Sequence, residues 1–96
     1  IASNFLVALE ESAPVLMEAA GVSEAREVLA PLVLRSAANW ADAGGDALTG
    51  PIARGDEDTV ARHLEALRER APELLPLYEA LAERTRALAE AREQGR

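Results

Sequence analysis

The chain has 96 residues and a mass of 10.2 kDa, so we expect one helical domain that spans residues 1–96. Hydrophobic residues make up 49% of the sequence, which excludes a disordered chain, and the longest apolar run, residues 28–34, is too short to cross a bilayer. The sequence contains no cysteine, which excludes disulfides, thiolate catalysis and zinc–thiolate sites and fits a cytoplasmic location.

The charge of the chain limits its possible partners. A net charge of −7 argues against binding to nucleic acid, because phosphate backbones attract clustered positive charge. All ten basic residues are arginines, which excludes a Schiff-base lysine and a P-loop lysine. Composition alone therefore makes the chain a poor candidate for an enzyme that acts by itself.

The first predicted helix runs from about residue 2 to residue 20 and ends at Gly21, a residue that readily adopts the left-handed conformation of a helix C-terminus. Pro14 lies inside this helix and predicts a kink or a break near Ser12, because it removes one backbone hydrogen bond. One face of the helix carries the apolar residues Ile1, Phe5, Leu9 and Leu16.

A second helix is predicted to begin after Ser23, which would cap it, and to carry apolar residues through to Trp40. Pro31 predicts a bend within it, and the glycines at 44–45 predict its end. Residues 46–55 then read as a loop.

Asp56 is the predicted N-cap of a third helix over residues 57–70. Pro72 opens a fourth helix, which tolerates Pro76 in its first turn, and the residues beyond Leu88 are expected to fray into solvent. This last helix shows the clearest apolar periodicity, at Leu74, Tyr78, Leu81, Thr85 and Leu88.

These elements predict an all-α fold, a compact bundle of about four helices with proline-induced kinks. Many of the helix faces are alanine, which permits close packing but buries little apolar area per residue. We therefore expect stabilisation by a second copy or an adjoining domain.

The glycine-bearing loop that precedes the third helix has two interpretations. Free backbone amides at a helix N-terminus can cradle a phosphate, and Arg54 is a nearby cation. The acidic residues 56–58, however, already occupy that terminus, which favours a capped structural turn that presents Thr49 and Arg54 to a ligand.

His63 is the one side chain expected to titrate near neutral pH, and it lies beside the apolar stripe of the third helix. It is either a boundary residue that makes a hydrogen bond between helices or a proton donor and substrate ligand. No Gly-x-Ser-x-Gly motif accompanies it, and one histidine without cysteine does not make a transition-metal site, so we expect no bound metal.

Several other polar or aromatic residues allow the same two readings. Ser3 and Asn4 are either helix-surface residues or part of a site, with Ser3 also a possible helix cap, and Asn39 poses the same choice. Trp40 is expected to anchor the core or an interface, and Tyr78 to lie in the core with a hydrated hydroxyl.

One run of residues, 48–56 (LTGPIARGD) followed by Thr59, Val60 and His63, resembles a signature of certain Rossmann-like oxidoreductases. It is similar to their helical C-terminal domain, a domain of unknown function, and the opening residues 2–5 and Asn39 match that domain as well. The resemblance covers nearly the whole chain.

The resemblance implies a fold like the C-terminal domains of pyrroline-5-carboxylate reductase, ketopantoate reductase and 6-phosphogluconate dehydrogenase. Such domains dimerise and close over a nicotinamide held by an N-terminal Rossmann domain. The 96 residues lack a Gly-x-Gly-x-x-Gly turn, so this chain is not expected to bind NAD(P) by itself, and cofactor-binding residues are not assigned. The residues implied to face a small-molecule substrate are Ser3, Asn4, Asn39, Thr49, Arg54 and His63, with His63 as the catalytic one.

Two functions thus compete. The first is the substrate-binding and dimerisation domain of an NAD(P)-dependent oxidoreductase, in which Arg54 would bind a substrate carboxylate and His63 would transfer a proton. The second is a non-catalytic acidic helical module for protein interaction or oligomerisation, with Trp40 and the stripe from Leu74 to Leu88 as its partner surface. Convergence of the candidate residues on one concave patch would favour the first.

Overall fold

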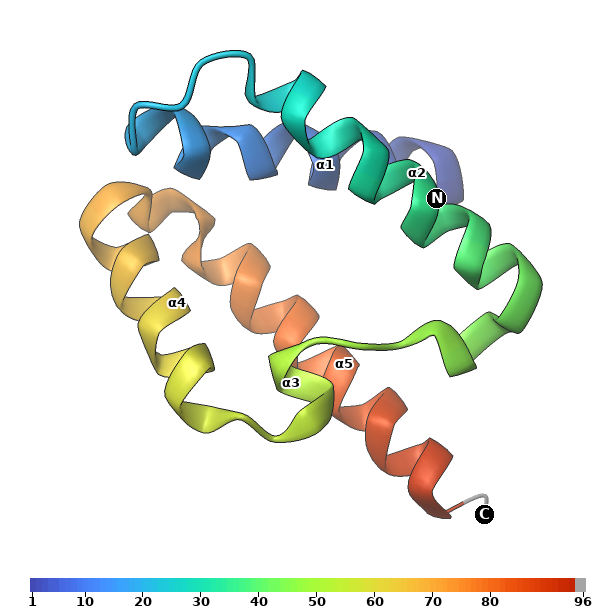
Figure 1. Cartoon of the computed structure of the whole chain (residues 1–96). Coiled ribbons are helices and arrows are strands. Elements are labelled where there is room, and N and C mark those ends of the chain that lie inside the picture. Colours follow the sequence, from blue (N-terminus) through green and yellow to red (C-terminus); the bar gives the residue numbers. More distant parts are fainter. Residues whose placement is uncertain (95–96) are drawn as a thin grey trace.

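The computed structural model describes residues 1–94 and contains helices but no strand in that range, which confirms the predicted all-α bundle (Figure 1). Two 3-10 turns, η1 (Gly44–Ala47) and η2 (Pro72–Leu74), connect the α-helices. The α-helices are α1 (Ala2–Ala19), α2 (Ala25–Ala43), α3 (Pro51–Arg54), α4 (Glu57–Arg70) and α5 (Leu75–Gln94).

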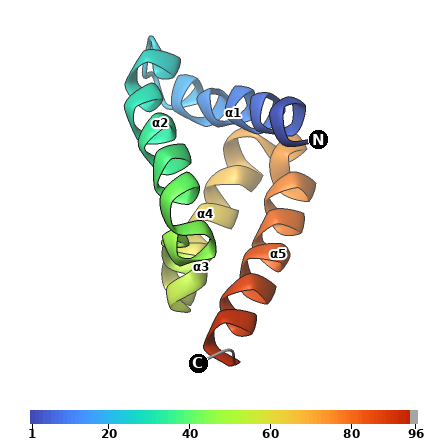
Figure 2. The same ribbon diagram turned by 90° about the vertical axis from the view of Figure 1, so that its right-hand side faces the viewer.

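The helices form two groups that meet at α1. The short helix α3 packs against both α4 and α5, which also contact each other, while α1 contacts α2 and α4. Figure 2 shows that α1 and α2 diverge from the turn that connects them, with α5 on the opposite side of the molecule from α2. The N-terminal half of α1 and the C-terminal half of α2 therefore point in different directions.

Helix α4 begins and ends as the sequence predicts. The side chain of Asp56 accepts a hydrogen bond from the backbone N–H of Thr59, which satisfies one of the free amides of the first turn. At the other end Ala71 leaves the helical conformation, with φ of −152°, just before Pro72. Pro72 opens the 3-10 turn η2 and not the fourth helix itself, so that prediction is wrong, while α5 begins at Leu75 and carries Pro76 in its first turn as expected.

The prediction that Ser23 caps the second helix is wrong. Helix α2 starts at Ala25, and Glu24 precedes it in the left-handed conformation with φ of +55° and no side-chain capping bond. The chain reverses direction within five residues after α1, using positive φ at both Gly21 and Glu24. The geometry of this tight connection, rather than the best capping side chain, sets where α2 begins.

Prolines do not break the helices. Helix α1 runs continuously through Pro14, so the break considered near Ser12 does not occur. Pro14 is buried, and it lines a shallow apolar cavity together with Leu29 and Val33 of α2. Packing against α2 thus holds the helix together where the missing N–H weakens it. Helix α2 likewise continues through Pro31.

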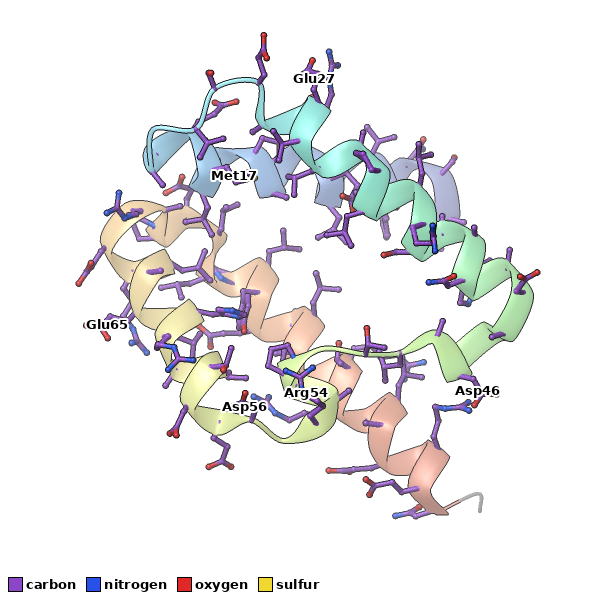
Figure 3. The ribbon with its side chains drawn as sticks, viewed as in Figure 1. Met17, Glu27, Asp46, Arg54, Asp56 and Glu65 are labelled. Atoms are coloured by element: carbon purple, nitrogen blue, oxygen red, sulfur yellow. The ribbon has the colours of Figure 1, made fainter. Side chains whose placement is uncertain are left out.

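Two further expectations are corrected. The region 46–55 is not wholly a loop, because it contains the end of η1 and the whole of α3. Helix α5 does not fray after Leu88 but continues to Gln94, and Arg92 in its last turn forms an ion pair with Asp46 of η1 (Figure 3). Gly45 leaves room for this arginine, since a Cβ there would lie 2.7 Å from its Nη1 atom.

The buried core is small. Besides Pro14, its members are Ala25, Val60, Leu67, Ala71 and Ala82, of which three are alanines. The stripe predicted on α5 is only partly covered, since Leu81 and Leu88 are both 40% exposed while Ala82 is buried. Much of the apolar surface of the helices therefore lies open in the single chain.

Candidate functional site

The sequence motif at residues 48–56 folds into an ordered turn between η1 and α4. Gly50 adopts a positive φ of +101° directly before Pro51, and Gly55 adopts +72° at the end of α3. The backbone N–H of Asp56 donates to the carbonyl oxygen of Pro51 at 2.8 Å. The turn therefore needs its glycines, and it leads directly into the N-cap of α4.

The carboxylate of Asp56 organises the start of α4 (Figure 3). One oxygen accepts from the backbone N–H of Thr59 at 3.2 Å and the other from the Thr59 hydroxyl at 2.7 Å. Arg62 donates to that hydroxyl at 3.0 Å, and an Arg54 nitrogen lies 4.0 Å from the carboxylate. The hydrogen bonds from Thr59, with the two arginines in support, lower the pKa of Asp56 below its ordinary value. The predicted capped turn is confirmed.

His63 lies one helical turn after Thr59 and makes a contact between α4 and α5. Its Nδ1 atom is 3.1 Å from the Tyr78 hydroxyl, and the two rings meet edge to face with centroids 6.0 Å apart. The hydrogen bond between helices considered for His63 is therefore present. It fixes the imidazole so that Nε2 is the ring nitrogen turned away from Tyr78, and the side chain is exposed. Partial burial raises the pKa of Tyr78, which keeps its hydroxyl protonated.

Tyr78 also lines an apolar cavity of about 370 Å³ between α1, α4 and α5. The hydroxyls of Ser12 and Thr85 border this cavity but donate to carbonyl oxygens of their own helices, at 2.9 Å and 2.7 Å. The rest of the wall is mainly leucine, including Leu9, Leu16, Leu67, Leu77 and Leu81. The cavity therefore suits apolar groups.

The six residues predicted to face a substrate lie on several elements. Ser3 and Asn4 are in the first turn of α1, Asn39 is near the end of α2, and Thr49 precedes α3. Arg54 ends α3, and His63 lies in α4. All six are exposed, and none of them lines the apolar cavity. The structure links Arg54 to Asp56 at the motif turn and orients His63 through Tyr78, but it shows no contact that joins these to Ser3, Asn4 or Asn39.

Two contributors were not predicted. Tyr78 was expected only as a core residue, yet it is the partner that orients His63. Thr59 appeared in the motif without a role, yet its backbone N–H and its hydroxyl donate to the Asp56 carboxylate, and the hydroxyl accepts from Arg62. A threonine three residues after an aspartate cap is a recognisable local signal. The pairing of His63 with a residue on the next helix carries no such signal in the sequence.

The described residues also bear on two other possibilities, a metal site and a membrane-spanning helix. Among residues 1–94, no three His, Asp or Glu side chains are grouped so as to hold a metal ion. None of the helices in this range combines the length and the apolar character that crossing a membrane requires.

Comparison with known proteins gives one match. No curated protein and no solved structure matches the chain. A family model described as Domain of unknown function (DUF2520) matches residues 1–85, which include α1 to α4, the motif turn and the His63–Tyr78 pair. The chain belongs to this DUF2520 family.

Proposed function

We propose that the chain is the helical substrate-binding and dimerisation domain of an NAD(P)-dependent oxidoreductase, whose cofactor is held by a Rossmann domain outside these 96 residues. The proposal starts from the resemblance of residues 48–56, Thr59 and His63 to such enzymes. The observation that carries it is that this motif forms one hydrogen-bonded turn on rigid helix ends, with Arg54 and His63 both exposed. A site built this way presents charge and a proton-transfer group without first having to order them.

Each of the two residues would have a distinct role. The Arg54 guanidinium would pair with a substrate carboxylate, exchanging its 4.0 Å contact with Asp56 for the ligand. His63, held at Nδ1 by Tyr78, would move a proton at Nε2 to or from the substrate oxygen or nitrogen that gains or loses a hydride at the adjacent carbon. NAD(P) would supply the hydride transfer itself.

The test uses the full-length protein from its native source. We expect it to bind NAD(P)H and to reduce members of a panel of keto and imino acids, with loss of NAD(P)H absorbance as the signal. Arg54→Ala should raise KM for carboxylate substrates, and His63→Ala should lower kcat. Arg26→Ala is the matched control, because the Arg26 side chain is 80% exposed and forms its ion pair with the adjacent Glu27, away from the motif turn. Unchanged turnover in both site variants would overturn the assigned roles.

The second candidate, a non-catalytic helical interaction module, is favoured by one observation. The six candidate residues are spread over several elements, and none of them lines the apolar cavity. Absence of NAD(P)H binding by the full-length protein would support the module and would contradict the oxidoreductase domain.

A further inference from the structure

The apolar cavity between α1, α4 and α5 has no role in the function proposed so far. Its volume of about 370 Å³ lies in the range of small-molecule sites. Three of its leucines, Leu9, Leu77 and Leu81, are 37%, 37% and 40% exposed, so parts of their side chains meet water. A hydrocarbon group bound in the cavity would be stabilised because it takes these surfaces out of water.

The polar groups in the wall of the cavity already have partners. The hydroxyls of Ser12 and Thr85 donate to carbonyl oxygens of their own helices, and the Tyr78 hydroxyl pairs with Nδ1 of His63. Neither Ser12 nor Thr85 has a second hydroxyl hydrogen to donate to a ligand, and replacing an existing bond gains little. The wall therefore favours a hydrocarbon group over a polar one.

The cavity adjoins both parts of the proposed site. Ile52, which belongs to the motif turn, lines the cavity and also lines the depression beside Gly55 and Glu57. Tyr78 lines the cavity as well, and its hydroxyl holds His63. A ligand bound at the motif turn can therefore place a neighbouring group in the cavity.

The charge at the edge of the cavity sets the orientation of such a ligand. Among the described residues, Glu10 is the charged one that lines the cavity, and it also lines the shallow depression next to Leu29 of α2. Glu10 thus marks the edge nearest α2, and Ile52 marks the edge nearest the motif turn. A ligand carboxylate would be repelled by Glu10 and attracted by Arg54, which follows Ile52 by two residues.

We propose that the cavity receives the hydrocarbon side chain of the substrate, whose carboxylate pairs with Arg54. The substrate class is then a keto or imino acid with an apolar side chain of several carbons, and not a small polar acid. This inference rests on the proposed function for the carboxylate site and for hydride transfer. The cavity itself contributes binding and orientation, and it takes no part in the chemistry.

The first experiment measures affinity against side-chain length. The full-length protein is titrated by calorimetry with pyruvate and with the straight-chain keto acids that carry ethyl, propyl, butyl and pentyl side chains. Oxidised NAD(P) is present throughout, because it cannot reduce a keto acid and the titration therefore reports binding alone. Each further carbon should strengthen binding by about two- to fourfold, the range from half to full burial of one methylene.

The second experiment fills the cavity. Ala13 is exposed and lines the cavity from α1, so Ala13→Leu places three further carbons there without disfavouring the helix. Affinity for the pentyl acid should fall by about tenfold, the worth of roughly three carbons, while affinity for pyruvate should not change. Ala8→Leu is the matched control, because Ala8 is exposed on the same helix and does not line the cavity.

The outcomes separate the cavity from the chemistry. Affinities that do not depend on chain length would overturn the cavity proposal, as would an equal effect of Ala13→Leu and Ala8→Leu on the pentyl acid. The series in the wild-type protein keeps the test decisive if a variant fails to fold. Reduction of the keto acids by NAD(P)H is measured separately. Length-dependent binding without reduction contradicts only the oxidoreductase, and reduction without length dependence contradicts only the cavity.

Discussion

Replacement of Leu67 by alanine tests whether the few large residues of the core hold the bundle together. Leu67 lies on α4, is 3% exposed and lines the apolar cavity between α1, α4 and α5. The substitution removes three carbons, and at about 0.8 kcal/mol for each carbon the loss of burial is about 2.5 kcal/mol. The neighbouring cavity is open, so little enclosed empty space is created and the additional cavity cost stays small. The expected cost is thus near the lower end of the range for buried leucines.

The assay is urea unfolding followed by far-ultraviolet circular dichroism, with all variants measured at the same protein concentration so that their free energies of unfolding are comparable. Leu81→Ala is the matched control, since Leu81 lines the same cavity but is 40% exposed, so its loss should cost about 1.5 kcal/mol. A cost for Leu67→Ala that is equal to or below the cost for Leu81→Ala would refute the assignment of Leu67 to the core.

Three further predictions concern polar contacts. The lowered pKa of Asp56 means that its stabilisation is present above its ordinary pKa of 3.8 and is lost as the pH falls through the lowered value, so acid unfolding of Asp56→Asn should show a weaker pH dependence than wild type. The raised pKa of Tyr78 makes stability depend on pH in the opposite direction. Its stabilisation is present below pH 10.0 and declines as the pH rises towards the raised value, so the free energy of unfolding should fall less in Tyr78→Phe than in wild type when measured by urea titration at alkaline pH. Arg92→Ala should change the free energy of unfolding by at most about 1 kcal/mol, because the ion pair is partly exposed, yet it should speed amide exchange in η1, and unchanged exchange there would contradict a role for the Asp46 contact.

Local signals explain which parts of the fold were predictable. Helix α4 was placed at its observed residues because Asp56 and Pro72 mark its ends with strong capping and breaking chemistry. The start of α2 was misplaced because the reversal after Gly21 is a three-dimensional constraint, which puts Glu24 rather than Ser23 at the cap. The continuation of α5 to Gln94 depends in part on Arg92 meeting η1, a contact between residues far apart in the sequence.

The candidate site shows the same division. The capped turn at Asp56 followed from adjacent residues, whereas the pairing of His63 with Tyr78 depends on how α4 and α5 pack. Periodicity identified an apolar stripe through Phe5 but not what covers it, since an amphipathic pattern is the same whether its partner is the same chain or another one. Trp40 illustrates this. It was expected to anchor either the core or an interface, and since it is 67% exposed it does not lie in the core of the single chain, so the interface stays a prediction.

The contact between Arg92 and Asp46 has a practical consequence for trimming this domain. The family match stops at residue 85, but the last two turns of α5 reach back to η1 through Arg92, and Ala89 borders the same shallow depression as Ala53 of α3. A shortened protein that ended at residue 85 would lose the residues of α5 that contact η1 and lie beside α3. The segment that leads into the motif turn, including η1, could then change its conformation. A loss of activity in such a shortened protein would reflect the missing residues and not the chemistry of Arg54 or His63. Expression of the domain should therefore extend at least to Gln94.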